Sequence, residues 1–211
     1  MQIKKLIGSI ALIGLATYLL PSCGGCNKNQ QPTNESSSKT EENNAQGADS
    51  LDYYIEHNLI TWKGWVDTAL HREFNLDSLN QVTVDSVRNP FTTVMTQERY
   101  DAYAPYFVYN KEKTMAIDMV SYGNVLEKDV NGKPRLLGGD PDSEVAILDV
   151  ASKVRLRILF VGPSITIKEV NWINDHEIII GGIEADEHGL LRPVAWKYNM
   201  ETSELLNWSA N

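Results

Sequence analysis

Hydrophobic residues follow two different spacings along this chain of 211 residues. In residues 51–80 they recur every three or four positions, at Leu51, Tyr54, Ile55, Leu59, Trp62, Trp65, Val66, Ala69 and Leu70. That period puts one apolar stripe along a helix. We therefore expect one or two amphipathic helices, capped by Asp49 or Ser50 and interrupted near Gly64. Trp62 and Trp65 are expected in the core, with an aromatic binding ledge as the alternative.

From residue 106 onward the pattern becomes the alternation of β-strands. Four strands separated by polar turns fill residues 106–161, and a similar series fills residues 168–208, each with a variable loop in the middle. In residues 154–160 one face is expected in the core and the other toward water. The expected core positions, which include Ile158 and Phe160, alternate with Arg155, Arg157 and Leu159. A short strand is also predicted over Val82–Val87, and a capped helix from Thr96 to Tyr103.

The repeated order of hairpin, loop and second hairpin resembles the four-stranded blades of β-propellers. About four or more blades are needed to close a propeller, and this chain has residues for two. The expected fold class is therefore α+β, mainly antiparallel β: N-terminal helices pack on a meander of two blade-like repeats, with no closed propeller. Either the two sheets pack face to face, or the helical segment caps an incomplete array.

The first residues have the pattern of an export signal. Lys4 and Lys5 precede an apolar run of about 15 residues, which is too short for a comfortable membrane span. The run ends in Leu20-Pro21-Ser22-Cys23, which resembles the lipobox of bacterial lipoproteins. That resemblance implies a signal peptide over residues 1–22, cleavage before Cys23, and acyl chains such as palmitate on Cys23. With Gly24 next, it also implies sorting to the outer membrane.

Residues 23–50 are expected to form the lipidated cysteine and a disordered tether, because they contain no aromatic side chain and few aliphatic ones. The folded part is then divided into a helical segment over 51–105 and an antiparallel meander over 106–211. Its stability must come from packing, because both cysteines of the chain, Cys23 and Cys26, precede it.

The charge of the chain argues against one class of partner. Its 28 acidic and 19 basic residues leave a formal net charge of -9. Nucleic acids bind to concentrated basic surfaces, so no nucleic-acid partner is expected. The predicted partners are the membrane, through the lipid on Cys23, and an envelope protein or glycan.

Two groups of residues are candidate sites. Asp140, Asp142 and Glu144 place carboxylates at alternate positions, where they could contribute oxygen ligands to a metal such as calcium. Tyrosines recur every three residues and could line a groove for a sugar or peptide: Tyr100, Tyr103, Tyr106 and Tyr109. The alternative for the acidic group is a polar turn, and for the tyrosines it is core packing.

No local pattern for a catalytic nucleophile, a phosphate-binding loop or a zinc protease is present. No catalytic residue and no cofactor is therefore predicted. The expected function is that of a lipid-anchored, non-enzymatic binding or scaffolding module of the cell envelope. The alternative is an envelope hydrolase with a metal or carboxylate site in the acidic loops.

Overall fold

The computed structural model describes residues 50–210. The predicted signal peptide, the lipidated Cys23 and the tether up to residue 49 lie outside these residues. No helix within residues 50–210 combines the length and the apolar character needed to cross a membrane.

Two consecutive helices begin the described part, α2 (Leu51–Asn58) and α3 (Ile60–Ala69). Ser50 caps α2, since its side chain accepts a hydrogen bond from the backbone N–H of Tyr53 at 3.2 Å. The interruption falls at the buried Leu59, and the prediction that placed it near Gly64 was wrong. Gly64 lies on the exposed side of α3, where a missing side chain only lowers helix propensity.

Within residues 50–210, ten strands form two five-stranded antiparallel sheets. Sheet A has the order β1-β12-β11-β10-β9, with β1 (Gln81–Ser86), β9 (Ile165–Trp172), β10 (Glu177–Ala185), β11 (Leu191–Asn199) and β12 (Glu204–Ser209). Sheet B has the order β2-β8-β7-β4-β3, with β2 (Thr92–Val94), β3 (Val108–Tyr109), β4 (Met115–Asp118), β7 (Ser143–Asp149) and β8 (Val154–Val161).

Each sheet contains one of the predicted meanders, so the α+β class with two four-stranded repeats and no closed propeller is confirmed. The strands β3, β4, β7 and β8 are successive neighbours in sheet B, and β9 to β12 are successive neighbours in sheet A. Each sheet also receives one edge strand from earlier in the chain. β1 pairs with β12, and β2 pairs with β8, so the segment 51–105 supplies strands as well as helices.

The variable loop predicted in the first repeat contains a hairpin, β5 (Asn124–Lys128) and β6 (Pro134–Gly138). Asp129 closes its turn by accepting hydrogen bonds from the backbone N–H groups of Asn131 and Lys133, at 2.8 and 2.9 Å. Gly132 has φ +76° there, a conformation open to glycine. This turn chemistry, rather than an apolar pattern, is what makes the hairpin.

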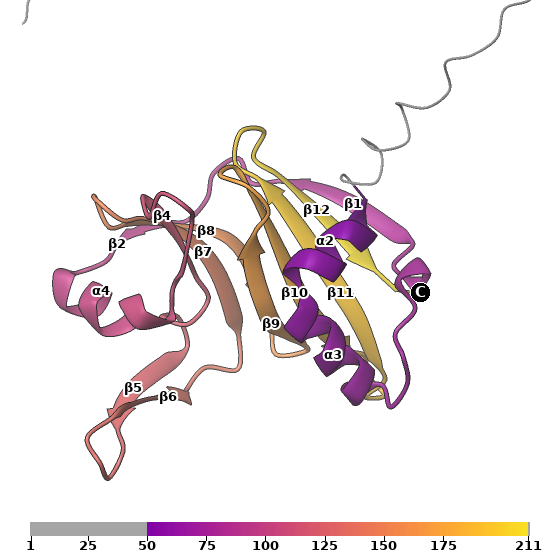
Figure 1. Ribbon diagram of the computed structural model, residues 1–211, viewed down its shortest axis with the longest axis horizontal. Helices are drawn as coiled ribbons and strands as arrows, with labels where there is room; N and C mark the ends of the chain where they lie inside the picture. Colours follow the sequence, from indigo (N-terminus) through magenta and orange to yellow (C-terminus); the bar gives the residue numbers. More distant parts are fainter. Residues whose placement is uncertain (1–49, 211) are drawn as a thin grey trace, which may run out of the picture. The chain divides into compact units, whose positions relative to one another are not determined.

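Three apolar clusters hold the described residues together. The largest lies between the two sheets and includes Ile117 and Ile147 from sheet B with Ile180, Val194 and Trp196 from sheet A. A second lies between sheet A and helices α2 and α3, which cover β9 and β10 (Figure 1). The third joins sheet B to α4 (Gln97–Tyr103), the predicted helix capped by Thr96. Both packing arrangements foreseen for the repeats therefore occur together.

Trp62 shows how closely α3 approaches sheet A. Its side chain is fully buried, and its Nε1–H donates to the carbonyl oxygen of Gly182 at 2.8 Å. A Cβ on Gly181 would lie 2.5 Å from Trp62 Cγ, so this contact requires glycine. Trp62 therefore belongs to the core, as expected.

Candidate functional site

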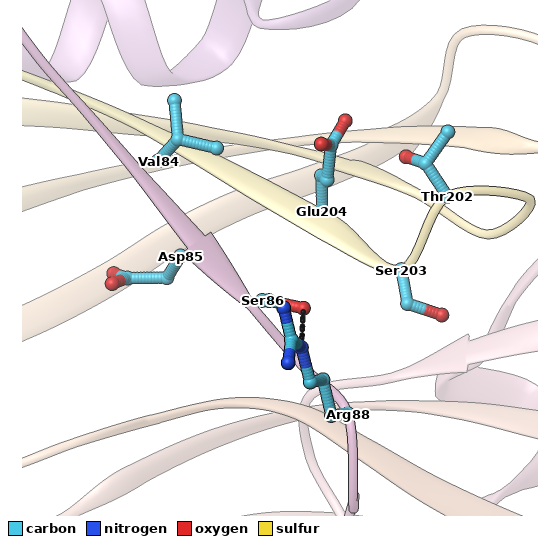
Figure 2. Close-up of a pocket in the computed structure, with 7 residues that line it drawn as sticks. All are labelled: Val84, Asp85, Ser86, Arg88, Thr202, Ser203 and Glu204. Atoms are coloured by element: carbon cyan, nitrogen blue, oxygen red, sulfur yellow. Dashed lines mark hydrogen bonds between the residues drawn. The ribbon is translucent and has the colours of Figure 1, made fainter.

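Two hollows in the surface of the described residues are candidate sites. The first lies where β1 and β12 end, and Figure 2 shows its lining side chains, with Arg88 Nε donating to Ser86 Oγ at 3.2 Å. Of its seven lining residues, Ser203 is half-buried and the other six are exposed. Exposed side chains of this kind are solvated and free to move, so this hollow offers no preorganised site.

The second hollow, here called the arginine pocket, lies beside β2 and β8 and has a volume of about 350 Å³. Its lining includes Phe91, Met95, Arg99, Tyr122, Arg155 and Arg157. Unlike the first hollow it has buried polar walls, because Ser121, Glu144 and Arg155 also line it and are buried. A pocket that combines apolar walls with a few fixed polar groups is the usual form of a ligand site.

Arg155 is the centre of the polar wall and is only 7% exposed. Its Nε donates to Asp118 Oδ2 at 2.6 Å, and its Nη1 donates to Glu144 Oε1. Both carboxylates are fully buried. Asp118 also accepts hydrogen bonds from the backbone N–H of Ser121 at 2.8 Å and from the Ser121 hydroxyl. These contacts hold the guanidinium in one orientation.

Arg157 is the second fixed arginine and is more exposed than Arg155. Glu144 Oε2 accepts its hydrogen bond. Its guanidinium carbon lies 4.6 Å from the ring centroid of Phe160 and 4.7 Å from that of Phe91, within the range of cation–π attraction. The third arginine, Arg99 of α4, donates to the carbonyl oxygen of Ser121 at 2.5 Å. Three guanidinium groups thus surround the same hollow.

The charge state of Arg155 follows from its neighbours. Burial lowers the pKa of its guanidinium, but the adjacent carboxylates of Asp118 and Glu144 more than offset this, so the pKa lies above its ordinary value. Arg155 is therefore always charged. Its Nη2 is buried and has no hydrogen-bond partner among the described residues. A buried donor of this kind lacks an acceptor that a ligand could supply.

The entrance to the arginine pocket is apolar and open to solvent. Phe91 and Val94 line the pocket and are 57% and 71% exposed. Phe160, which contacts the lining residues Arg157 and Tyr122, is 44% exposed. All three belong to β2, β8 or the residue just before β2. Exposed apolar side chains that gather around a polar hollow are typical of contact sites.

The acidic residues named as metal candidates do not form one site. Glu144 points its carboxylate at Arg155 and Arg157. Asp140 is exposed, and its carboxylate accepts hydrogen bonds from the backbone N–H of Asp142 at 3.0 Å and from Tyr122 Oη at 3.3 Å. Within residues 50–210, His, Cys, Asp and Glu side chains nowhere gather in threes around a space suited to a metal ion.

The four candidate tyrosines lie mainly in the third apolar cluster. Tyr103 is buried and donates to the carbonyl oxygen of Asn124 at 2.6 Å, while Tyr100 and Tyr109 pack around it. The hydroxyls of Tyr100 and Tyr109 lie 3.2 Å apart. Burial, together with this contact, raises the pKa of Tyr109 to about 12. Tyr106 is half-buried in the short 3₁₀ turn Ala104–Tyr106. The structure thus places three of the four in packing positions.

The prediction that Arg155 faces water and Phe160 faces the core was wrong. A β-bulge in the β7–β8 pairing changes the alternation of side chains, because Val145 pairs with Leu159 while Ala146 pairs with Arg157. Phe160 is thereby moved to the face of the arginines, and Leu159 enters the core. The missed signal was the acidic Asp118 at the end of an otherwise apolar strand, since a buried acid needs a basic partner.

Comparisons with protein-family models, with curated proteins and with solved structures find no match to this chain. The chemistry of the arginine pocket follows from its own contacts. Both oxygens of Glu144 are engaged by arginines, and both oxygens of Asp118 accept hydrogen bonds. The arrangement presents fixed positive donors, which is the chemistry of anion recognition.

Proposed function

We propose that this chain is a lipid-anchored cell-envelope protein whose folded part is a non-enzymatic binding module, with the arginine pocket as its contact site. The observation that carries the proposal is the pair Arg155 and Arg157, held by buried carboxylates beneath an exposed apolar entrance. Preorganised donors of this kind lower the entropy lost on binding.

The role of the carboxylates favours binding over hydrolysis. A general acid or base must exchange protons with the substrate from a position within hydrogen-bond reach. Asp118 and Glu144 instead hold the arginines through charged hydrogen bonds. The two carboxylates therefore position the guanidinium groups of the arginines.

The anchoring part of the proposal is supported by the sequence Leu20-Pro21-Ser22-Cys23 and the apolar run before it. Replacing Cys23 by Ala removes the thiol that would be acylated. We expect the variant to lose labelling by a palmitate analogue, while Cys26→Ala keeps it. Equal labelling of wild type and Cys23→Ala would refute the anchor.

The binding part can be tested by photo-crosslinking in intact cells. Val94 is replaced by p-benzoylphenylalanine, and the mass of the intact chain is measured after irradiation. We expect an adduct of defined mass from this position, because Val94 lies at the pocket entrance. The control is the same substitution at Val130, which is fully exposed in the β5–β6 turn. Identical adducts from both positions, or none from Val94, would contradict the proposal.

A further inference from the structure

We infer that the ligand of the arginine pocket is a small monocarboxylate that carries one apolar group, an inference that rests on the proposed binding function. The carboxylate would be held by the arginines, and the apolar group would lie against the exposed aromatic entrance.

The first argument is the charge of the pocket. Three arginines and one carboxylate line it, and Asp118 lies directly behind Arg155. The five groups together carry one net positive charge within a chain whose formal net charge is -9. A single negative charge neutralises this excess, whereas a doubly charged phosphate would exceed it. The pocket therefore favours a monoanion.

The second argument is the unpartnered donor. The Arg155 side chain is 8% exposed, and its Nη2 has no acceptor among residues 50–210. The other two guanidinium nitrogens of this residue are already paired with Asp118 and Glu144. Arg155 lines the pocket, and one further acceptor oxygen at Nη2 would complete the hydrogen bonds of its guanidinium. Because this atom is closed off from solvent, binding would require a small shift of the pocket wall. A carboxylate offers such an oxygen and a second one for Arg157 or Arg99.

The third argument is size and surroundings. A hollow of about 350 Å³ lies at the small end of ligand sites. Phe91 and Met95 form its apolar side, and Phe91 also stacks against Arg157. An apolar group placed there would bury the exposed face of Phe91 and reduce the water around the ion pair. Both effects strengthen binding.

The test is isothermal titration of the full chain in detergent, with detergent alone as the blank. The probes are 3-phenylpropanoate, its neutral amide, and phenyl phosphate. We expect the acid to bind about tenfold more tightly than the amide, because one charged hydrogen bond is worth at least that factor. Equal binding of acid and amide, tighter binding of phenyl phosphate, or no binding of the acid at millimolar concentration would overturn the inference.

A variant pair assigns the binding to this pocket. Arg155 is not used, because its removal would leave two buried carboxylates without a partner. Arg99 is exposed, so the Arg99→Gln variant should still fold. It should bind 3-phenylpropanoate about tenfold more weakly than wild type does. The control is Arg88→Gln, an exposed arginine at the other hollow (Figure 2). Equal weakening by both substitutions would overturn the assignment.

One more probe in the same titration distinguishes a free carboxylic acid from the carboxylate at the end of a peptide. The peptide acetyl-Gly-Gly-Phe carries the same phenyl and carboxylate groups at a chain end. Tighter binding of the peptide than of 3-phenylpropanoate would assign the ligand to a peptide terminus, and the reverse would assign it to a free acid. Failure of all carboxylates, combined with an adduct from the Val94 crosslink, would reject the ligand class and leave the binding function standing.

Discussion

Sheets A and B have the same strand order and closely similar hairpins, yet they differ in what they bury. In each sheet the last hairpin turns through an Asp or Asn, Asp149 in sheet B and Asn199 in sheet A, whose side chain accepts backbone hydrogen bonds. Each turn ends in a residue with positive φ, Lys153 at 58° and Ser203 at 57°. The pairing registers therefore allow the two sheets to be compared position by position.

At three equivalent positions sheet B has charges where sheet A has aliphatic side chains. The register matches Asp118, Glu144 and Arg155 of sheet B with Ile180, Val194 and Leu205 of sheet A. The three aliphatic residues belong to the cluster between the sheets. Their charged counterparts lie on the opposite side of sheet B, where the arginine pocket opens. The same backbone thus carries a dry face in one sheet and an ion-pair network in the other.

The difference shows that the two sheets pack through non-equivalent faces, as successive blades of an array do. One face of sheet A packs in the cluster between the two sheets. The corresponding face of sheet B points to the other side, toward α4. That second face is only partly covered by α4, so water and a ligand can reach it. The charged residues therefore occur in sheet B, where this face is left partly open, and not in sheet A, where the corresponding face is packed in the core.

The largest effect is expected on the covered side of sheet A. Trp62→Ala removes a fully buried indole and its hydrogen bond to Gly182, and should lower the free energy of unfolding by about 4 kcal/mol. Urea unfolding followed by circular dichroism measures it. Gly181→Ala should also destabilise, because its new Cβ meets the indole. In the double variant Trp62→Ala/Gly181→Ala, the methyl added at position 181 should lower the free energy of unfolding little beyond the effect of Trp62→Ala alone. Full additivity would contradict the proposed contact.

The next effect concerns the charged face of sheet B. Arg155→Leu leaves Asp118 and Glu144 buried without their partner, and should cost about 3 kcal/mol. The triple variant Asp118→Ile, Glu144→Val and Arg155→Leu installs the residues of sheet A at all three positions. We expect it to regain most of the loss, again measured by urea unfolding. A triple variant less stable than Arg155→Leu alone would contradict the match of these three positions between the two sheets.

The smallest effect is expected in the two matching turns. Hydrogen bonds from the side chain and backbone of Ser152 hold the pKa of Asp149 below its ordinary value of 3.8. A lowered pKa means that the ionised carboxylate stabilises the fold above pH 3.8 and that this contribution disappears as pH falls through the lowered pKa. In the Asp149→Asn variant this acid-induced loss of stability should be absent. Asn199, at the matching position of sheet A, accepts similar backbone hydrogen bonds through an amide that does not titrate.

The measurement is the free energy of unfolding of wild type and Asp149→Asn between pH 2 and 5. The difference between the curves should change by less than about 1 kcal/mol, because the turn is exposed to solvent. Curves that remain parallel over this range would show that the Asp149 carboxylate does not contribute.

The regular parts of the fold were predictable because they depend on local patterns. Ser50 and Thr96 are capping residues followed by apolar periodicity, and both helix starts were found. The strand β2 was missed since its three residues have little apolar pattern and follow Pro90. The hairpin β5–β6 was missed for a similar reason, as only Leu126 and Leu136 pack on the third cluster.

The candidate site was less predictable because it depends on contacts between distant strands. The sequence pattern groups Glu144 with its neighbours Asp140 and Asp142, whereas its partners in the structure are Arg155 and Arg157 on the adjacent strand. The bulge opposite Val145 and Ala146 decides which side chains share a face. A register shift of this kind has no sequence pattern of its own.

The pairing of β1 with β12 has a consequence for biogenesis. Val82 lies opposite Trp208, so the edge of sheet A joins segments made near the beginning and the end of the described part. A nascent chain cannot add this strand until residues 204–209 have left the ribosome, and contacts of such long separation also slow refolding. Until then β1 has no strand of sheet A to pair with.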